Sequence, residues 1–437
     1  MSHKTMILGA GMSGLAAAMS SGLPVVEAAD SPGGICLSYR MRPGDPAPLP
    51  GEQADEESYR FETGGGHWIF GGDPAVLHFI RSLVQVQHYT RRSSVYFPDT
   101  GQSVPYPIQN HLRHLDTTVA VAALGEMSRP TRTGATMQHW IRDNFGETLS
   151  KLFFAPFHDL YTAGLYTAIA PQDGYKSPVD LDRALQGALV DTPPAGYNTT
   201  FIYPQGGLNL LANRMAERCD ISYGRRVTQI DTQARTIGFA DGSEQAYDKL
   251  LSTLPLNQAL EMAGIGTPER PDPHTSVLVV NIGAVRAARC PDDHWLYIPH
   301  SGAGFHRVGF YSNVDRSFLP ASARESGNRV SIYVERAFRA GDRPDHDAIA
   351  AYCARVVEEL QRWGFIGAAE VVHPTWVEVA YTWSWPGSRW KQCAIQALEQ
   401  AGVYQIGRYG RWIFQGIADS IRDGFVAGSS FRPWPEA

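Results

Sequence analysis

The sequence reads Lys4-Thr5-Met6-Ile7-Leu8-Gly9-Ala10-Gly11-Met12-Ser13-Gly14 near its start, which predicts a short buried strand that enters a glycine-rich turn. An alanine-rich segment of helical character follows to about Ser20. Leu23-Pro24-Val25-Val26 then predicts a second strand that ends in Glu27. A glycine-rich turn alone would be weak evidence for a ligand. Strand, glycines, helix, strand and acid in this order are typical of a βαβ unit that binds a dinucleotide.

Each marked residue of this unit has a physical role in such a site. Gly9 permits the tight turn, Gly11 lets a pyrophosphate approach the backbone, and Gly14 lets the helix pack on the strand. The helix N-terminus offers free N–H groups and the positive end of its dipole to phosphates. Glu27 stands where an acidic side chain would accept hydrogen bonds from ribose hydroxyls.

The residues after Glu27 read Ala28-Ala29-Asp30-Ser31-Pro32-Gly33-Gly34, so a glycine pair follows the acid. This continuation resembles the FAD-binding start of the flavoproteins that include protoporphyrinogen oxidases, amine oxidases and UDP-galactopyranose mutases. The resemblance implies that Gly33 and Gly34 lie against the flavin side of FAD. From the residues alone, an ordinary loop after a strand fits the same letters.

The composition is that of a globular enzyme. Of the 437 residues, 43% are hydrophobic and 19% are charged, which suits a large core and about two or three domains. The formal net charge of −6 argues against a nucleic-acid partner, and the lack of an apolar run of about 18 residues argues against a membrane span. A strand from residue 4 leaves no room for a signal peptide, so we expect a cytoplasmic enzyme, either monomeric or homo-oligomeric. Five scattered cysteines form no metal-type cluster, so we expect reduced thiols and no metal.

We expect an α/β fold with a discontinuous domain plan. A Rossmann-like FAD-binding domain of the GR2 type is predicted from residues 1–75, 205–260 and 395–437. Residues 76–204 are predicted to form a mainly helical substrate domain, and residues 261–394 a substrate domain with an antiparallel sheet and a helix.

Periodicity places the main elements of these domains. Helices are predicted over 73–88, 136–166, 208–218 and 345–362. Strands are predicted over 274–284, 294–298, 306–313 and 328–334, as an antiparallel sheet that is either a substrate platform or purely structural.

Two further segments are interpreted through the flavoprotein resemblance. Residues 225–255 predict a strand, a hairpin and a returning strand; the resemblance implies that the backbone near Val227 faces the adenine of FAD, whereas the residues alone predict a plain hairpin. Val403-Tyr404-Gln405-Ile406-Gly407-Arg408-Tyr409-Gly410 predicts a strand and a G-R-x-G turn, and a helix follows from Ala418-Asp419-Ser420-Ile421. The resemblance implies that Gly407, Arg408, Asp419 and Ser420 lie at the cofactor.

A narrower resemblance spans nearly the whole chain. The segments that resemble UDP-galactopyranose mutases, in chain order, are Gly64-Gly65-Gly66-His67-Trp68-Ile69-Phe70, Val104-Pro105-Tyr106-Pro107-Ile108-Gln109-Asn110, Tyr197-Asn198-Thr199-Thr200-Phe201, Trp295-Leu296-Tyr297-Ile298-Pro299 with Phe305-His306-Arg307, and Gly407-Arg408-Tyr409-Gly410-Arg411-Trp412. The resemblance implies a mutase that interconverts the pyranose and furanose forms of a nucleotide sugar. Reduced FAD would supply N5 as the nucleophile for the anomeric carbon, and NAD(P)H would serve as a transient reductant in the same cleft.

The resemblance also assigns roles to single residues. His67, after Gly66, would lie in a loop over the flavin that moves on reduction. Arg183 and Arg307 would clamp the diphosphate, because guanidinium groups suit phosphate oxygens. Asn198 would contact the sugar or a phosphate. The slot for flavin, nucleotide and sugar would further be lined by Phe70, Arg92, Tyr106, Gln109, His158, Tyr297, Trp385, Arg408 and Phe414.

The chain departs from the mutase pattern at several positions. Val314, Trp385 and Phe414 stand where the family carries tyrosines, and His158 and Ala418 stand where it carries asparagines. Each lost hydrogen bond to a phosphate would be worth roughly 1.5–3 kcal/mol. The departures predict either a substrate other than UDP-galactose or a different hold on the phosphates.

The alternative is an oxidoreductase of the same fold, in which oxidised FAD removes a hydride inside an aromatic cage. Tyr381, Trp383, Trp385 and Phe414 could form that cage. The histidine loop and Arg307 favour the mutase, because a simple oxidase requires neither. A flavoprotein without catalysis is a third interpretation, and the many polar and aromatic groups expected at the flavin argue against it.

Overall fold

The computed structural model describes residues 5–49, 56–129, 131–172, 174, 178–196 and 198–432. The N-terminal segment forms the predicted βαβ unit: β1 (Met6–Leu8), α1 (Met12–Ser21) and β2 (Val25–Val26). The predicted Lys4 and Tyr197 lie outside the described residues. A five-stranded parallel sheet has the order β10-β2-β1-β14-β20, with β10 (Ile221–Ser222), β14 (Leu250–Ser252) and β20 (Val403–Gln405).

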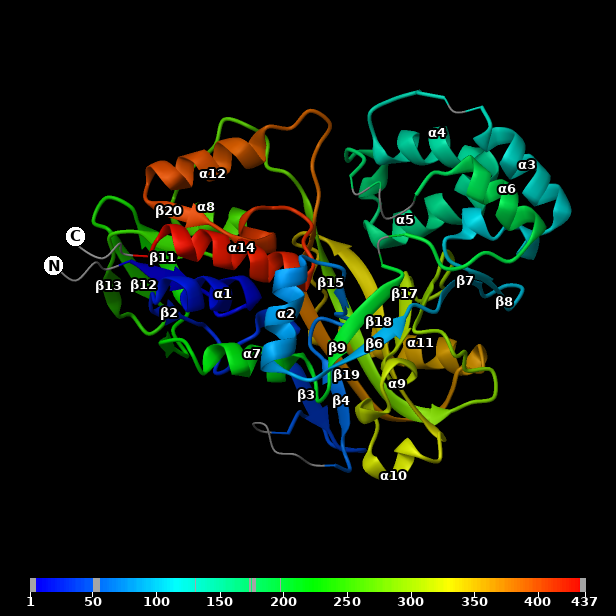
Figure 1. Cartoon of the computed structure of the whole chain (residues 1–437), viewed down its shortest axis with the longest axis horizontal. Helices are drawn as coiled ribbons and strands as arrows, with labels where there is room; N and C mark the ends of the chain where they lie inside the picture. Colours follow the sequence, from blue (N-terminus) through cyan, green and yellow to red (C-terminus); the bar gives the residue numbers. More distant parts are fainter. Residues whose placement is uncertain are drawn as a thin grey trace.

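Alternation along β1 sends side chains to two separate cores. Ile7 packs with α1, whereas Met6 and Leu8 pack with the antiparallel β11 (Val227–Asp231), β12 (Thr236–Phe239) and β13 (Glu244–Ala246) and with α8 (Leu256–Met262) and α12 (Trp390–Gln400). On the α1 side lie α7 (Leu208–Ala216) and the C-terminal α14 (Ile417–Ser430), as Figure 1 shows. Gly424 permits close contact of α14 with α1, since a Cβ there would lie 2.2 Å from the Ser13 carbonyl oxygen.

A second, larger sheet has seven strands. Its order is β19-β15-β18-β17-β16-β7-β8, with β19 (Ile366–Thr382), β15 (His274–Arg286), β18 (Arg329–Arg339), β17 (Arg307–Phe310), β16 (Trp295–Tyr297), β7 (Ser93–Phe97) and β8 (Gln102–Pro105). Only the β16–β7 pair is parallel among these described strands. The helix predicted over residues 345–362 is α11 (His346–Arg362), and its apolar side packs on this sheet.

The remaining helices gather beside the sheet. Figure 1 shows α3 (Thr117–Met127), α4 (Met137–Leu149), α5 (Ala155–Tyr161) and α6 (Leu181–Leu189) together at the edge of the molecule away from α1 and α14. A π-helix, Ser150–Phe154, joins α4 to α5. Residues 76–204 thus carry the helices expected there, and they also contribute β7 and β8 to the large sheet. The proposed domain boundaries stay a prediction.

Smaller elements complete the chain. β5 (Ile69–Phe70), β9 (Thr200–Pro204) and β6 (Val86–Thr90) form one antiparallel sheet, and β3 (Ser38–Met41) pairs with β4 (Tyr59–Glu62). The short helices are α2 (Pro74–Leu83), α9 (Tyr311–Val314), α10 (Ala321–Arg324) and α13 (Gly407–Gly410), with 3-10 turns at Gly34–Cys36, Ile108–Asn110, Leu112–His114, Leu165–Thr167 and Arg316–Phe318.

Two predicted elements end earlier than expected. The Asp73 carboxylate caps α2 by accepting the Ala75 N–H at 2.8 Å, but the helix stops at Leu83 rather than 88. Val86–Thr90 instead forms β6, because its backbone pairs with β9, which is distant in sequence. The strand predicted over 306–313 ends at Phe310 and turns into α9.

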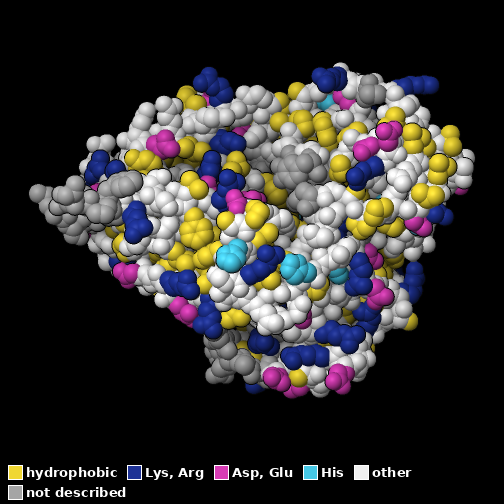
Figure 2. Space-filling model, viewed as in Figure 1, with side chains coloured by type: hydrophobic (Ala, Val, Ile, Leu, Met, Phe, Trp, Pro, Cys, Tyr) yellow, Lys and Arg dark blue, Asp and Glu magenta, His cyan; other side chains and the backbone are white. Residues whose placement is uncertain are grey.

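The surface carries charges of both signs, and the cysteines are free thiols. Figure 2 shows basic and acidic side chains interspersed over the visible face. Among the described helices, none has both the length and the apolar character that crossing a membrane requires. The described residues contain no cluster of His, Cys, Asp and Glu side chains suited to a metal ion. All five cysteines are described, and none forms a disulfide.

Candidate functional site

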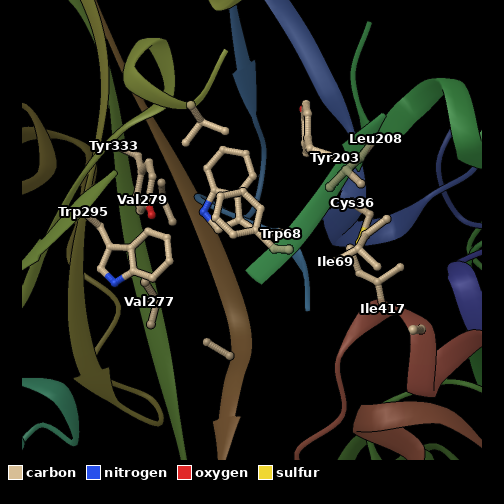
Figure 3. Packing of buried hydrophobic residues seen from close by; sticks show 14 of the residues in the cluster. Cys36, Trp68, Ile69, Tyr203, Leu208, Val277, Val279, Trp295, Tyr333 and Ile417 are labelled. Atoms are coloured by element: carbon tan, nitrogen blue, oxygen red, sulfur yellow. The ribbon is translucent and has the colours of Figure 1, made fainter. Parts of the chain in front are cut away.

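One large pocket lies where the parallel sheet, the seven-stranded sheet and the α4–α5 segment meet. Its lining includes most of the predicted site residues: Gly9, Gly11, Glu27, Gly33, Gly34, Gly66, His67, Phe70, Tyr106, His158, Asn198, Tyr297, Arg307, Gly407, Arg408, Phe414 and Ser420. Figure 3 shows part of its surroundings, with Trp295, Tyr333 and Val277 on the sheet side, Trp68 in the middle, and Cys36 and Ile417 opposite.

The glycine turn has the geometry that a dinucleotide needs. Gly9 has a φ of +95°, and a Cβ at Gly14 would lie only 1.9 Å from the Gly9 carbonyl oxygen. At Gly11, by contrast, no described residue other than its neighbours in the chain places an atom within 4 Å of the position that a Cβ would take, and Gly11 lines the pocket. Gly14 therefore serves helix packing outside the pocket, whereas Gly11 leaves room for a pyrophosphate at the N-terminus of α1.

Glu27 and the second glycine pair are held against this turn. The Glu27 carboxylate accepts backbone N–H groups from Ala10 at 2.6 Å and Ala29 at 2.8 Å, which fixes it at the edge of the pocket. The Gly33 N–H donates to the Ala10 carbonyl at 2.9 Å, and Gly33 and Gly34 both have positive φ angles. A carboxylate held in this way has lone pairs left for ribose hydroxyls.

The C-terminal segment closes the same side of the pocket. The Gly407 N–H donates to Asp423 at 2.6 Å, and Arg408 donates to the carbonyls of Ala380 at 3.2 Å and Gln415 at 3.1 Å. The Arg408 guanidinium also lies 4.7 Å from the centre of the Phe414 ring. Arg408 is thereby held at the pocket wall by groups from two segments.

The first turn of α14 also lines the pocket, through Gly416, Ile417 and Ser420. Asp419 is exposed and lies outside the lining, where its carboxylate accepts the Gly416 N–H at 3.1 Å. Two helix N-termini, those of α1 and α14, thus face one cavity. This arrangement fits the diphosphate and flavin of a dinucleotide cofactor.

Val227 is buried in the core between β11 and α8 and does not line the pocket. The β11–β12 pairing is irregular between Val227 and Gln229, so the strand register shifts at this point. The expected contact between the backbone near Val227 and adenine stays a prediction.

The loop that contains His67 lies against the seven-stranded sheet, on the side of the pocket away from the glycine turn. His67 Nδ1 lies 3.2 Å from the Gly65 carbonyl oxygen, and burial lowers the pKa of the imidazole, so it is neutral at neutral pH. Position 66 has room only for glycine, because a Cβ there would lie 2.2 Å from the Tyr333 hydroxyl. The loop is therefore packed directly against β18.

Arg307 extends from β17 into the pocket and is paired there with a carboxylate. Its Nη1 lies 3.2 Å from Glu335 Oε2, and the buried His306 Nε2 lies 3.4 Å from the same oxygen. Burial raises the pKa of Glu335, but the positive charge of Arg307 and the nearby His306 imidazole outweigh it, and the net pKa is lowered. Burial has the opposite effect on His306, whose pKa it lowers, because burial disfavours the charged form of either side chain. The pocket thus contains a compact pair of opposite charges.

Sequence reasoning missed Glu335. It is a charged residue inside the apolar run of β18, and it faces Arg307 across the strand pair β17–β18. A single carboxylate in such a run was the available signal, because a charge in a buried strand is rarely without a partner.

Aromatic side chains form the remaining wall. Tyr106 and Tyr297 have ring centres 4.4 Å apart, and Phe157 meets Tyr297 at 5.5 Å. Tyr161 meets Tyr381 at 4.8 Å. The sequence analysis did not assign Phe153, Phe154, Phe157, Tyr161, Trp295, Tyr333 or Glu335 to the pocket that they line.

Four predicted substrate residues do not line this pocket. Arg183 is on the exposed side of α6 and pairs with Asp180 at 3.4 Å. Arg92 is exposed and donates to the Asn313 carbonyl at 3.3 Å. The buried Gln109 amide donates to the Pro178 carbonyl at 2.9 Å, and the Trp385 indole donates to the Pro271 carbonyl at 2.8 Å.

Comparison with known proteins agrees with this geometry. The family model of flavin containing amine oxidoreductases matches residues 12–424, and the chain belongs to this family. It is a flavin-dependent enzyme.

Solved structures of several activities share the fold. A structure of reduced UDP-galactopyranose mutase has a TM-score of 0.82 at 23% identity and covers 98% of this chain and 95% of its own. A putative protoporphyrinogen oxidase from Exiguobacterium sp. 255-15 has a TM-score of 0.71 at 13% identity, with 98% of each chain covered. A putrescine oxidase bound to putrescine has a TM-score of 0.56 at 17% identity, also with 98% of each chain covered.

Proposed function

We propose that the enzyme binds FAD and, with the flavin reduced, interconverts the pyranose and furanose forms of a nucleotide sugar. The observation that carries the proposal is that His67 and Arg307 line the same pocket as the two glycine turns and the N-terminus of α14. The ordered sequence resemblance to UDP-galactopyranose mutases supports the same function. We also propose NAD(P)H as a transient reductant in this pocket, which anaerobic bleaching of the flavin absorbance by NADPH would test.

The side chains divide the work between binding and positioning. Bound reduced flavin would supply a nucleophilic nitrogen for the anomeric carbon. Arg307 would bind the diphosphate, and Asn198 and Tyr297 would hold the nucleotide sugar in place. The aromatic wall would exclude water from the reacting carbon, and neutral His67 offers a hydrogen bond to sugar or flavin.

An oxidoreductase acting on a small amine or alcohol is the second candidate. It is favoured by Glu335, whose carboxylate already balances the charge of Arg307, and by the aromatic wall that includes Tyr161 and Tyr381. A neutral or cationic substrate would need no free guanidinium in this pocket.

An anaerobic turnover assay separates the two candidates. UDP-, GDP- and TDP-sugars are incubated with oxidised and with dithionite-reduced enzyme, and the products are resolved by chromatography. Ring isomers formed only by the reduced enzyme are the result expected for the mutase. Absence of isomers, together with oxygen uptake when amines or alcohols are added to the oxidised enzyme in a separate aerobic assay, would assign the oxidoreductase.

A further inference from the structure

Arg91 is buried behind the substrate side of the pocket and connects two of its walls. The residue follows β6 and is 2% exposed. Its Nη2 donates to the carbonyls of Tyr106 and Ala195, both at 2.9 Å, and its Nη1 donates to the side-chain oxygen of Asn198. Tyr106 and Asn198 both line the pocket.

The contact with Arg91 determines how the Asn198 amide is turned. A guanidinium carries only donors, so the Asn198 atom that faces it must be the amide oxygen. The opposite orientation would place N–H groups against N–H groups and leave a buried guanidinium without its acceptor. The amide nitrogen, with its two N–H donors, therefore points away from Arg91.

We infer that Arg91 is a positioning residue that fixes the Asn198 amide with its N–H groups toward the bound substrate, so that the pocket selects an acceptor oxygen at this point. The inference rests on the proposed function, in which that oxygen belongs either to the diphosphate or to the sugar. Both sources share one chemistry, an oxygen that accepts a hydrogen bond.

The same arginine also supports the aromatic wall. Its guanidinium lies 5.4 Å from the centre of the Tyr106 ring, and Tyr106 packs on Tyr297 at 4.4 Å. Tyr297 lies in turn 5.7 Å from the guanidinium of Arg307. Loss of Arg91 would thus loosen both the donor at Asn198 and the ring beside Arg307.

Two substitutions of Asn198 test the orientation and the donor separately. Asn198→Asp keeps an oxygen toward Arg91 and adds a charge, so its Tm should equal or exceed that of the wild type. Asn198→Leu removes the acceptor, so its Tm should fall. Both variants lack the N–H donor, and both should bind the ligand roughly tenfold or more weakly.

Calorimetric titration with UDP, GDP and TDP and with their sugar conjugates identifies the oxygen. A loss of affinity already seen with the free diphosphates would place the acceptor on the diphosphate. A loss seen only with the conjugates would place it on the sugar. Wild-type affinity of Asn198→Asp for every ligand would overturn the inference, as would a Tm of Asn198→Asp as low as that of Asn198→Leu. A wild-type enzyme that binds none of these ligands would refute the proposed function, and the order of Tm values would still decide the orientation.

Arg91→Lys tests the positioning role against a matched buried arginine. Arg60 is also 2% exposed, lies 4.1 Å from the ring centre of Phe318 and donates to Ser317 at 3.0 Å, outside the pocket. Arg91→Lys should weaken ligand binding about tenfold with flavin content unchanged, whereas Arg60→Lys should lower the Tm without changing affinity. An equal change in affinity for both variants would overturn the positioning role.

Discussion

Replacing Arg307 by alanine is the most direct test of the proposed diphosphate site. The Arg307 side chain is 21% exposed and lies 3.2 Å from Glu335 Oε2. In the proposed complex, the variant would remove charge-assisted hydrogen bonds to the diphosphate worth roughly 1.5–3 kcal/mol each, and it would leave the Glu335 carboxylate facing the ligand without a counter-charge. We therefore expect the affinity for a nucleoside diphosphate to fall by at least about 2 kcal/mol, or roughly 30-fold.

The partner substitution Glu335→Gln has the opposite expected effect. At 3.2 Å and an effective dielectric constant of about 20, Arg307 and Glu335 attract each other by about 5 kcal/mol before desolvation is counted. A diphosphate must compete with this attraction for the guanidinium. Removing the carboxylate charge should therefore tighten diphosphate binding, by about tenfold once desolvation is included. The double variant should regain part of the affinity that Arg307→Ala loses.

Isothermal titration of the flavin-loaded variants with UDP, GDP and TDP measures both effects. Arg336→Ala is the matched control, because Arg336 is on the same strand as Glu335 but donates to the Ala303 carbonyl at 3.0 Å outside the pocket. The flavin absorbance of each variant shows that the cofactor is retained. Equal affinity of wild type and Arg307→Ala for all three diphosphates would refute the clamp.

The glycine turn and a buried acid give further predictions. Gly11→Ala should fold with an unchanged Tm as apoprotein but lose flavin absorbance, because the new Cβ enters the space left for the pyrophosphate. Gly14→Ala should instead lower the Tm, because its Cβ would lie 1.9 Å from the Gly9 carbonyl oxygen and overpacking costs about 1–3 kcal/mol; an unchanged Tm would contradict this packing. Burial raises the pKa of Glu62 to about 7 from 4.5, so between these values the folded chain binds more protons than the unfolded chain and stability falls as pH rises. Glu62→Gln should accordingly be more stable than wild type by about 3 kcal/mol at pH 8 and similar to it at pH 5; a pH-independent difference in thermal melts would count against this account.

Local chemistry made the cofactor half of the fold predictable. The turn from β1 into α1 needs glycines at fixed positions, so the spacing of glycines in the sequence predicts the conformation of the turn. β19 was not predicted, because its 17 residues include Pro374, and its backbone is organised by pairing with β15, about a hundred residues earlier. Non-local pairing of this kind leaves little trace in a short window of sequence.

The residues of the substrate side of the pocket were predictable only in part, because the sequence does not show which way each side chain points. Arg91 and Arg92 are adjacent, and only Arg91 is turned inward to Tyr106 and Asn198. A shift of one residue in an extended chain sends a side chain to the other face, so the choice between two neighbouring arginines cannot be made from spacing. Arg183 was predicted at the diphosphate, but it lies on the solvent-exposed side of α6 and does not line the pocket.

The pair of Arg307 and Glu335 also explains why the fold alone leaves the reaction open. The glycine turns of a dinucleotide-binding fold bind the cofactor and carry no information about the substrate. For the two proposed functions, the feature that would distinguish a diphosphate from an amine is the charge at β17 and β18, where the guanidinium of Arg307 is paired with the carboxylate of Glu335. A diphosphate must draw Arg307 away from Glu335, whereas an amine would draw Glu335 away from Arg307. The sign of the change in ligand affinity caused by Glu335→Gln therefore reports the class of substrate, independently of any turnover.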